Sequence, residues 1–246
     1  LGREVADAAG RPIIVAGSVG PTGEIMGAAG SLSHESAVEM FEETARGLMD
    51  GGADVLWVET ISAPEEFRAA AEAFGNVGAP WCGTMSFDTA GRTMMGVTSQ
   101  DMVALVDSLP NPPIAFGANC GVGASDLMRT VLGFAATGTD RPIIAKGNAG
   151  IPKYSDGHIH YNGTPELMAD YACLARDAGA RIIGGCCGTM PVHLKAMREA
   201  LETRAPGPRP TLDVIAEKLG GFSSASDGTG DDEGAGRERR GRRRRG

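Results

Sequence analysis

The sequence contains no apolar run approaching the roughly 20 residues that a membrane-spanning helix needs, and no secretory-type segment opens it. Its five cysteines are an odd number and lie among apolar residues, which argues against a disulfide framework. The net charge of −8 argues against nucleic-acid binding by the body of the chain. These absences predict a cytoplasmic, reducing setting, with neither a membrane nor a nucleic acid as partner.

Common nucleotide-binding and redox motifs are also absent. The glycine-rich stretch 17–23 has neither the Gly-x-Gly-x-x-Gly pattern nor the P-loop pattern that cradles phosphates. The adjacent Cys186 and Cys187 lack the Cys-x-x-Cys spacing of disulfide oxidoreductases. His158 and His160 form a His-x-His pair that could ligate a metal, but the polar, glycine-containing sequence around them favours a hairpin tip.

The sequence does contain a regular alternation of short apolar runs and helical patterns. Six apolar runs are typical of buried strands, and a helical pattern follows each of them. The expected strands are 11–16, 54–58, 80–86, 114–117, 142–145 and 181–184. Strands buried on both faces and separated by helices predict an α/β fold with a parallel sheet.

Polar or glycine-rich clusters follow every expected strand, and this arrangement separates two architectures. A doubly wound sheet concentrates its ligand loops at one switch point, whereas a TIM-type (β/α)₈ barrel builds its active site from all the loops at the strand C-termini. The pattern favours the barrel, over residues 1–205. Because six units are two short of eight and the sequence opens on Leu1, we expect the first two βα units to be missing. Residues 206–221 are expected to hold a short helix, and residues 222–246 a disordered Gly/Asp/Arg-rich tail.

Three cysteines stand next to glycines just after expected strands. Cys120 ends one apolar run, and Cys186 and Cys187 end another. A disulfide between adjacent cysteines is strained, so a soft metal that takes a third ligand is the better use of the pair. Three protein ligands with an open fourth position are typical of catalytic zinc. Cys82 lies within an expected strand and Cys173 within an expected helix, so both are expected in the core.

Four other polar residues are candidates for binding a substrate. Glu59 ends an apolar strand and is expected either as a rim carboxylate or as a carboxylate directed into the barrel mouth, where it would bind an ammonium group. Ser86, Asn119 and Asn148 also follow strands, at the end of the sheet where barrels place their active sites.

Five motifs together carry a specific resemblance. They are Val15-Ala-Gly-Ser-Val-Gly-Pro-Thr22, Gly52-Ala-Asp-Val-Leu-Trp-Val-Glu-Thr60, Gly117-Ala-Asn-Cys120, Asn148-Ala-Gly150 and Gly184-Gly-Cys-Cys-Gly-Thr189. In this order they resemble the homocysteine S-methyltransferase family, the zinc barrels that include betaine–homocysteine methyltransferase and the homocysteine module of cobalamin-dependent methionine synthase. The Asn-Cys and Gly-Gly-Cys-Cys motifs are highly specific for that family.

The resemblance implies a zinc-dependent methyltransferase that makes methionine from homocysteine. It implies that Cys120, Cys186 and Cys187 bind zinc and that Glu59 holds the amino group of homocysteine. Zinc would deprotonate the homocysteine thiol, and the resulting thiolate would attack an electrophilic methyl group.

Departures from the family pattern bear on the methyl donor. Nothing matches the family's Asp-Gly-x-x-Gly-Thr loop, Thr60 stands where animal betaine enzymes carry tyrosine, and Pro191 with His193 looks closer to the methionine synthase module. No corrinoid-binding Asp-x-His-x-x-Gly motif is present, so we expect a small methyl-onium donor, with betaine first. The alternatives are S-methylmethionine, dimethylsulfoniopropionate, or a methyl-corrinoid on a separate protein, as in a split methionine synthase. The non-enzyme alternative is an inactive, truncated zinc-binding barrel. A homo-oligomer is also expected among the partners.

Overall fold

The fold is built around one parallel sheet of six strands. A computed structural model describes residues 1–26, 30–88, 90–155 and 157–225. The strands lie side by side in the order β1 (Ala16–Val19), β2 (Val55–Ile61), β3 (Trp81–Met85), β4 (Ala115–Cys120), β5 (Ile143–Gly147) and β8 (Ala180–Gly185). Spatial order follows chain order without reversal, which is the winding of a TIM-type barrel, whereas a doubly wound sheet reverses. The expected α/β fold of this type is confirmed, and β1 and β8 form the two edges of the described sheet.

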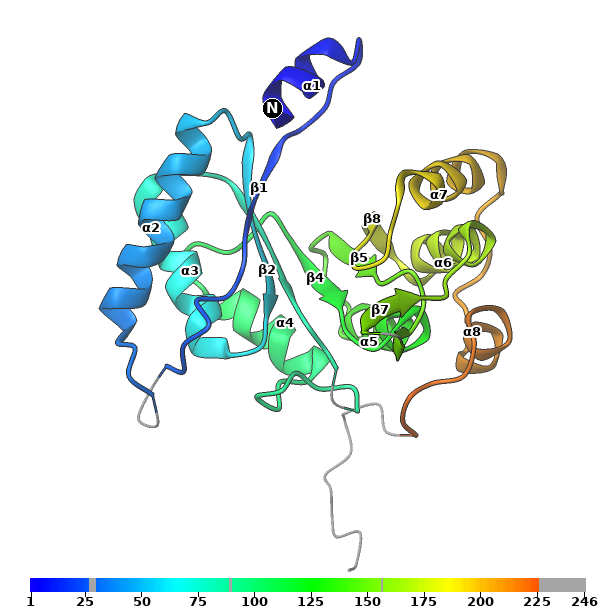
Figure 1. The fold of residues 1–246 in the computed structure, drawn as a ribbon. Helices are drawn as coiled ribbons and strands as arrows, with labels where there is room; N and C mark the ends of the chain where they lie inside the picture. Colours follow the sequence, from blue (N-terminus) through cyan, green and yellow to red (C-terminus); the bar gives the residue numbers. More distant parts are fainter. Residues whose placement is uncertain (27–29, 89, 156, 226–246) are drawn as a thin grey trace, which may run out of the picture.

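Helices connect the strands and lie along one side of the sheet. They are α2 (His34–Asp50), α3 (Pro64–Val77), α4 (Ser99–Ser108), α5 (Ala124–Ala136), α6 (Pro165–Ala178) and α7 (Pro191–Thr203). In Figure 1 they form an arc, from α2 and α3 on one flank through α4 and α5 to α6 and α7 on the other. The short α1 (Gly2–Ala8) precedes β1, and Arg3 of α1 bonds Asp54 just before β2 at 2.8 Å. Among the described helices, none is long and apolar enough to cross a membrane.

Side-chain caps fix where several helices begin. Ser33, Thr98, Thr164 and Thr211 each accept a hydrogen bond from a backbone N–H in the first helical turn, which satisfies one of the donors a helix start leaves unpaired. Helix α3 is an exception. Strand β2 continues to Ile61, so α3 begins only at Pro64, without a side-chain cap.

The two faces of the sheet bury different side chains. The helix-covered face carries a cluster of aromatic rings packed at an angle to one another: Phe41, Phe67, Phe74, Trp81, Phe87, Phe116 and Phe134. Burying each such ring stabilises the fold by about 1.5–3 kcal/mol. The opposite, inner face carries a smaller apolar layer of Val55, Cys82, Ala115 and Ile144, flanked by Trp57 and Ile182. The expected burial of Cys82 and Cys173 is confirmed, at 2% and 8% exposure.

The first predicted strand is misplaced. The apolar run 11–16 lies mostly before β1, and Ile14 is 73% exposed. Strand pairing begins only where Ala16 faces Val55. Because β1 is an edge strand, apolar residues beside it have no partner strand to bury them.

Two segments outside the six-stranded sheet also form regular structure, a hairpin and a short helix. The loop before Asn162 contains an antiparallel hairpin, β6 (Pro152–Ser155) paired with β7 (His158–Tyr161), and its second strand carries the two histidines. The short helix expected within 206–221 is α8 (Leu212–Leu219). Phe222, the first residue of the predicted tail, contacts α5, where the Arg129 guanidinium lies over its ring at 3.9 Å from the centroid. Residues 226–246 of the predicted tail lie outside the described residues.

Candidate metal and substrate site

Three cysteine sulfurs converge at the C-terminal end of the sheet. Cys120 ends β4, and Cys186 and Cys187 follow β8. Their Sγ atoms all lie within 4.8 Å of one another, and the Cys120 and Cys187 sulfurs are 3.9 Å apart. Within the described residues this is the one group of three or more His, Cys, Asp or Glu side chains that could hold a metal ion. The structure therefore brings together the three residues that the sequence selected.

Asn119 organises the β4 side of this cluster. Its buried side chain accepts hydrogen bonds from the Thr60 backbone N–H at 2.9 Å and the Thr84 hydroxyl at 2.7 Å, and it donates to the Thr60 hydroxyl at 2.8 Å. Thr60 and Cys120 both have left-handed backbone conformations, with φ of 66° and 61°. Such a conformation costs a non-glycine residue about 1–2 kcal/mol. The Asn119 bonds hold Thr60 in this strained conformation, and the strain at Cys120 re-aims its thiol at the end of β4.

Asn148 organises the other side. Its side chain donates to the Gly121 carbonyl at 2.8 Å and accepts from the Cys187 backbone N–H at 3.1 Å. It thereby joins the loop after β4 to the loop after β8, and the Cys186 N–H donates to the Gly147 carbonyl nearby at 2.8 Å. Asn119 and Asn148 thus have hydrogen-bond partners within the chain. We assign them to positioning the cysteines, and their contact with substrate stays a prediction.

Tight packing fixes the turn that carries Cys187. Gly188 has φ of +75°, and a Cβ there would lie 2.3 Å from the Tyr161 ring of the hairpin. His193, 8% exposed, accepts from the Met190 N–H at Nδ1, so its Nε2–H donates to the Gly163 carbonyl at 3.1 Å. His193 therefore ties the cysteine loop to the start of α6.

A carboxylate also lies on the inner face of the sheet, near the C-terminal end of β2. Glu59 is part of β2, and its carboxylate accepts hydrogen bonds from the Ser18 hydroxyl at 2.6 Å and from the Lys146 ammonium at 2.5 Å. The Glu59 side chain is 19% exposed and that of Lys146 22%. Of the two expectations for Glu59, the geometry favours a carboxylate that faces inward and binds an ammonium group.

The electrostatics of the cluster favour one ionised thiol. A hydrogen bond from the Cys120 thiol lowers the pKa of Cys186 to about 5, although burial of Cys186 acts in the opposite direction. Asn119, the Cys187 backbone and the Lys146 ammonium lower that pKa further. The same hydrogen bond to Cys186 raises the pKa of Cys120, as does burial. Cys82, away from these partners, has its pKa raised to about 11 by burial.

Ser86 is the site candidate about which the structure says least. It follows β3, is 7% exposed, and its backbone N–H donates to the Ile61 carbonyl at 3.0 Å. Side chains alternate across a strand, so Ser86 shares the inner face with Cys82 and Thr84. A role in substrate binding remains a prediction for Ser86.

The sequence did not single out three residues that bond site candidates, Ser18, Thr84 and Lys146, nor the buried Glu66. The first three occupy inner-face positions, which strand alternation could have indicated had the strand boundaries been placed correctly. Glu66 is only 5% exposed and accepts from the N–H and hydroxyl of Thr22. This contact anchors the glycine-rich loop 17–23 to α3.

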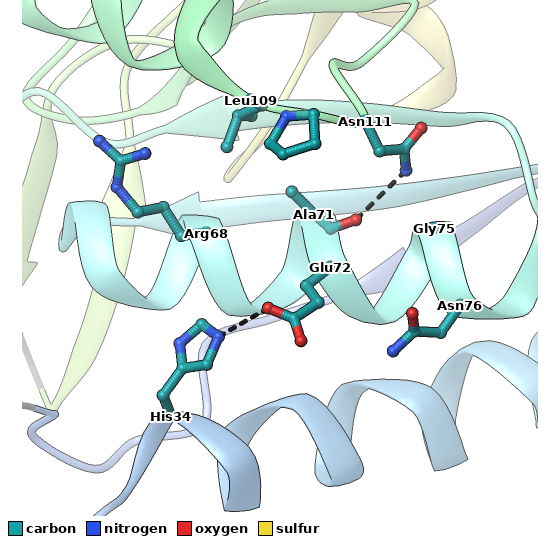
Figure 2. Close-up of a pocket in the computed structure, with 9 residues that line it drawn as sticks. His34, Arg68, Ala71, Glu72, Gly75, Asn76, Leu109 and Asn111 are labelled. Atoms are coloured by element: carbon teal, nitrogen blue, oxygen red, sulfur yellow. Dashed lines mark hydrogen bonds and ion pairs between the residues drawn. The ribbon is translucent and has the colours of Figure 1, made fainter.

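A second hollow lies on the opposite, helix-covered side of the sheet. This groove of about 420 Å³ runs along α3 between α2 and the turn at Asn111 (Figure 2). Its polar groups bond one another, with His34 on Glu72 at 2.8 Å and the Asn111 amide on the Ala71 carbonyl at 3.2 Å. The groove is lined by α2 and α3 and not by the cysteines, so we place the site at the cysteine cluster.

Comparison with known proteins decides the family. A sequence profile described as homocysteine S-methyltransferase matches residues 1–201. The chain belongs to the homocysteine S-methyltransferase family. It is therefore a member of a methyltransferase family, as the motifs predicted.

Solved structures agree with this assignment. The apo form of the homocysteine methyltransferase MmuM from Escherichia coli is 28% identical, with a TM-score of 0.63, over 80% of this chain and 68% of that one. The metallated form of the same protein is 27% identical, with a TM-score of 0.60, over 80% and 65%. The chain thus spans about two thirds of the length of these relatives.

Proposed function

We propose that this protein transfers a methyl group from a small onium compound to homocysteine, giving methionine, and that it uses zinc. One observation carries the proposal: three cysteine sulfurs lie within 4.8 Å of one another, at the end of the sheet whose inner face also carries the Glu59 carboxylate, in a chain of this family. Its Escherichia coli relative MmuM, a homocysteine methyltransferase, has been solved in apo and metallated forms, which supports both a homocysteine substrate and a metal.

The donor set fits zinc. At a Zn–S distance of about 2.3 Å, tetrahedral geometry places two sulfur ligands about 3.8 Å apart. The Cys120 and Cys187 sulfurs are separated by 3.9 Å, so little movement is needed to bind an ion. Cysteine thiolates are soft ligands, and three of them leave a fourth position for a substrate. Bound zinc would supply the acidity that keeps a substrate thiol ionised at neutral pH.

The chain's own residues hold the substrate and the cluster in place. Glu59 offers a carboxylate that binds an ammonium group, and here we assign it the amino group of homocysteine. Asn119 and Asn148 fix the loops that carry the cysteines, so the thiols keep their separation without a substrate. Such preorganisation lowers the barrier because the groups do not reorganise during the reaction.

For the donor we propose betaine, among the small methyl-onium compounds. A methyl-onium cation is attracted to aromatic faces, typically within about 6 Å of the ring centroid. Two rings are available: Tyr161 packs on the cysteine turn, and Trp57 already holds the Lys146 ammonium 5.2 Å from its ring centroid.

An assay of methionine formation tests the proposal. Zinc-loaded protein is given homocysteine with betaine, S-methylmethionine, dimethylsulfoniopropionate or methylcobalamin. We expect turnover with betaine, abolished in Cys120→Ser and retained in Cys173→Ser, since Cys173 lies in α6 away from the cluster. Turnover with methylcobalamin alone would instead indicate a split methionine synthase. No methionine from any donor would contradict the proposed activity.

A further inference from the structure

Lys146 lies on β5, between the two strands, β4 and β8, that lead to the cysteines. In the sheet register it faces Asn119 of β4 on one side and Gly184 of β8 on the other. Both neighbours come shortly before a cysteine in the chain. Cys120 directly follows Asn119, and Cys186 comes two residues after Gly184. Along the strand direction, Lys146 therefore lies one to two residues before the cysteines.

The Lys146 side chain reaches across the inner face of the sheet. Its ammonium binds Glu59 of β2 at 2.5 Å, although β3 and β4 lie between β2 and β5. It also lies over the Trp57 ring, at 5.2 Å from the centroid. A side chain can bridge three strand spacings, about 14 Å along a flat sheet, only if the sheet is curved. The ion pair thus spans the inside of the curved sheet, at the mouth beside the cysteines.

This arrangement matches the charges of an α-amino acid. A zwitterion carries an ammonium and a carboxylate on one carbon, and the site offers one carboxylate and one ammonium that pair with each other when no substrate is present. In homocysteine two methylene groups separate that carbon from the thiol. A homocysteine with its thiol at the cysteines and its ammonium at Glu59 must therefore pass over Lys146.

We propose that Lys146 binds the α-carboxylate of the thiol substrate, next to Glu59, to which the proposed function already assigns the amino group, so that the two residues together form the receptor for the zwitterion. On binding, Glu59 exchanges the Lys146 ammonium for the substrate ammonium, and Lys146 takes the substrate α-carboxylate. One ion pair becomes two, and no charge is left without a partner. This inference rests on the proposed function, since it assigns Lys146 to the recognition of the same substrate.

The exchange makes both charged groups of the substrate necessary. A thiol without the carboxylate would take Glu59 but leave the Lys146 ammonium partly buried and unpaired, which is costly. A thiol without the amine would take Lys146 but leave the partly buried Glu59 carboxylate without a cation. Lys146 is therefore a specificity-determining residue. Its loss should weaken discrimination against thiols that lack the carboxylate and should leave discrimination against thiols that lack the amine unchanged.

The test compares homocysteine with two truncated thiols. The first, 3-aminopropanethiol, lacks the carboxylate, and the second, 4-mercaptobutanoate, lacks the amine. We expect the full chain to prefer homocysteine over either by about 100-fold in kcat/KM. In Lys146→Met, preference over 3-aminopropanethiol should fall to within about threefold, while preference over 4-mercaptobutanoate persists. Lys146→Arg should recover part of the lost preference, because it keeps the charge.

A control variant and a binding measurement separate this inference from the proposed activity. Lys195→Met removes an exposed lysine whose partner is Glu199, and it should change neither preference. Calorimetry of L-methionine binding needs no turnover, and Lys146→Met should weaken that binding at least tenfold. If methionine binds in this way but no donor supports turnover, the receptor stands and the proposed activity fails. If Lys146→Met keeps both the 100-fold preference and the methionine affinity, the inference is overturned.

Discussion

At the scale of single residues, the site depends on thiols whose protonation differs because their neighbours differ. Cys186 has its pKa lowered to about 5 by the Cys120 thiol, Asn119 and Lys146, whereas Cys82 has its pKa raised to about 11 by burial. In the unfolded chain both thiols would ionise near about 8.5. The ionised Cys186 therefore stabilises the metal-free fold fully above about pH 8.5, and this contribution is lost as the pH falls toward 5.

This difference predicts a thiolate in the metal-free protein at neutral pH. Thiolate ultraviolet absorbance should be present at pH 7 and should disappear on acidification through about pH 5. The change should be absent in Cys186→Ser and unaltered in Cys173→Ser. An identical titration in Cys186→Ser would assign the ionised group elsewhere.

Asn119 is the residue whose loss should damage the site most through stability. Asn119→Ala leaves the buried Thr84 hydroxyl and the Thr60 N–H without their acceptor, and each such orphaned group costs about 1–3 kcal/mol. We expect a loss of about 3 kcal/mol in the free energy of unfolding in urea. Asn76→Ala, which removes an exposed bond to Glu42, is the matched control and should cost less than about 0.5 kcal/mol. Equal losses in the two variants would refute this role for Asn119.

At the scale of elements, the hairpin and the cysteine turn are expected to fold as one unit. Gly188→Ala meets both a left-handed φ and the Tyr161 ring, whereas Gly138→Ala meets a similar φ of +76° with nothing within 4 Å. Gly138→Ala should cost about 1–2 kcal/mol, and Gly188→Ala about 1–3 kcal/mol more.

A double-mutant cycle checks the cause. In a Tyr161→Ala background, the extra cost of Gly188→Ala in thermal or urea unfolding should vanish, leaving the cost seen at Gly138. If the cost of Gly188→Ala is the same with and without Tyr161, the hairpin does not pack on this turn.

Elements also show what the sequence could and could not predict. Five of the six expected apolar runs lie largely within strands of the sheet, because a strand buried on both faces needs little besides apolar residues. The helix caps at Ser33, Thr164 and Thr211 were predictable, because a cap depends only on a side chain and the backbone N–H groups two or three residues after it. Pairing partners are not local. The run 11–16 was therefore placed too early, since the start of β1 is set by where Val55 lies.

The site residues also divide into those that local sequence predicts and those that depend on distant contacts. The three cysteines could be selected from sequence because each ends a strand beside glycine, and strand ends meet in a parallel sheet. Lys146 could not, since its importance comes from a contact with Glu59 that is 87 positions away and across two strands. The strained backbone at Thr60 was equally invisible, because it is held by hydrogen bonds to the Asn119 side chain, 59 positions away.

At the scale of the whole molecule, stability is expected to fall from the middle of the sheet toward its edges. Strands β3 and β4 have a neighbour on each side and lie beneath the aromatic cluster, whereas β1 and β8 are edges of the described sheet. Hydrogen exchange should therefore be slowest in β3 and β4 and at least tenfold faster in β1. Uniform protection across all six strands would contradict this gradient.

The central claim is that Cys120, Cys186 and Cys187 form one zinc site, and metal analysis tests it most directly. Protein prepared with zinc should contain one ion per chain, because the three sulfurs lie within 4.8 Å of one another. The double substitution Cys186→Ser/Cys187→Ser should lose that zinc, while Cys173→Ser should keep it. Stoichiometric zinc in the double variant would show that the metal binds elsewhere and would contradict the account.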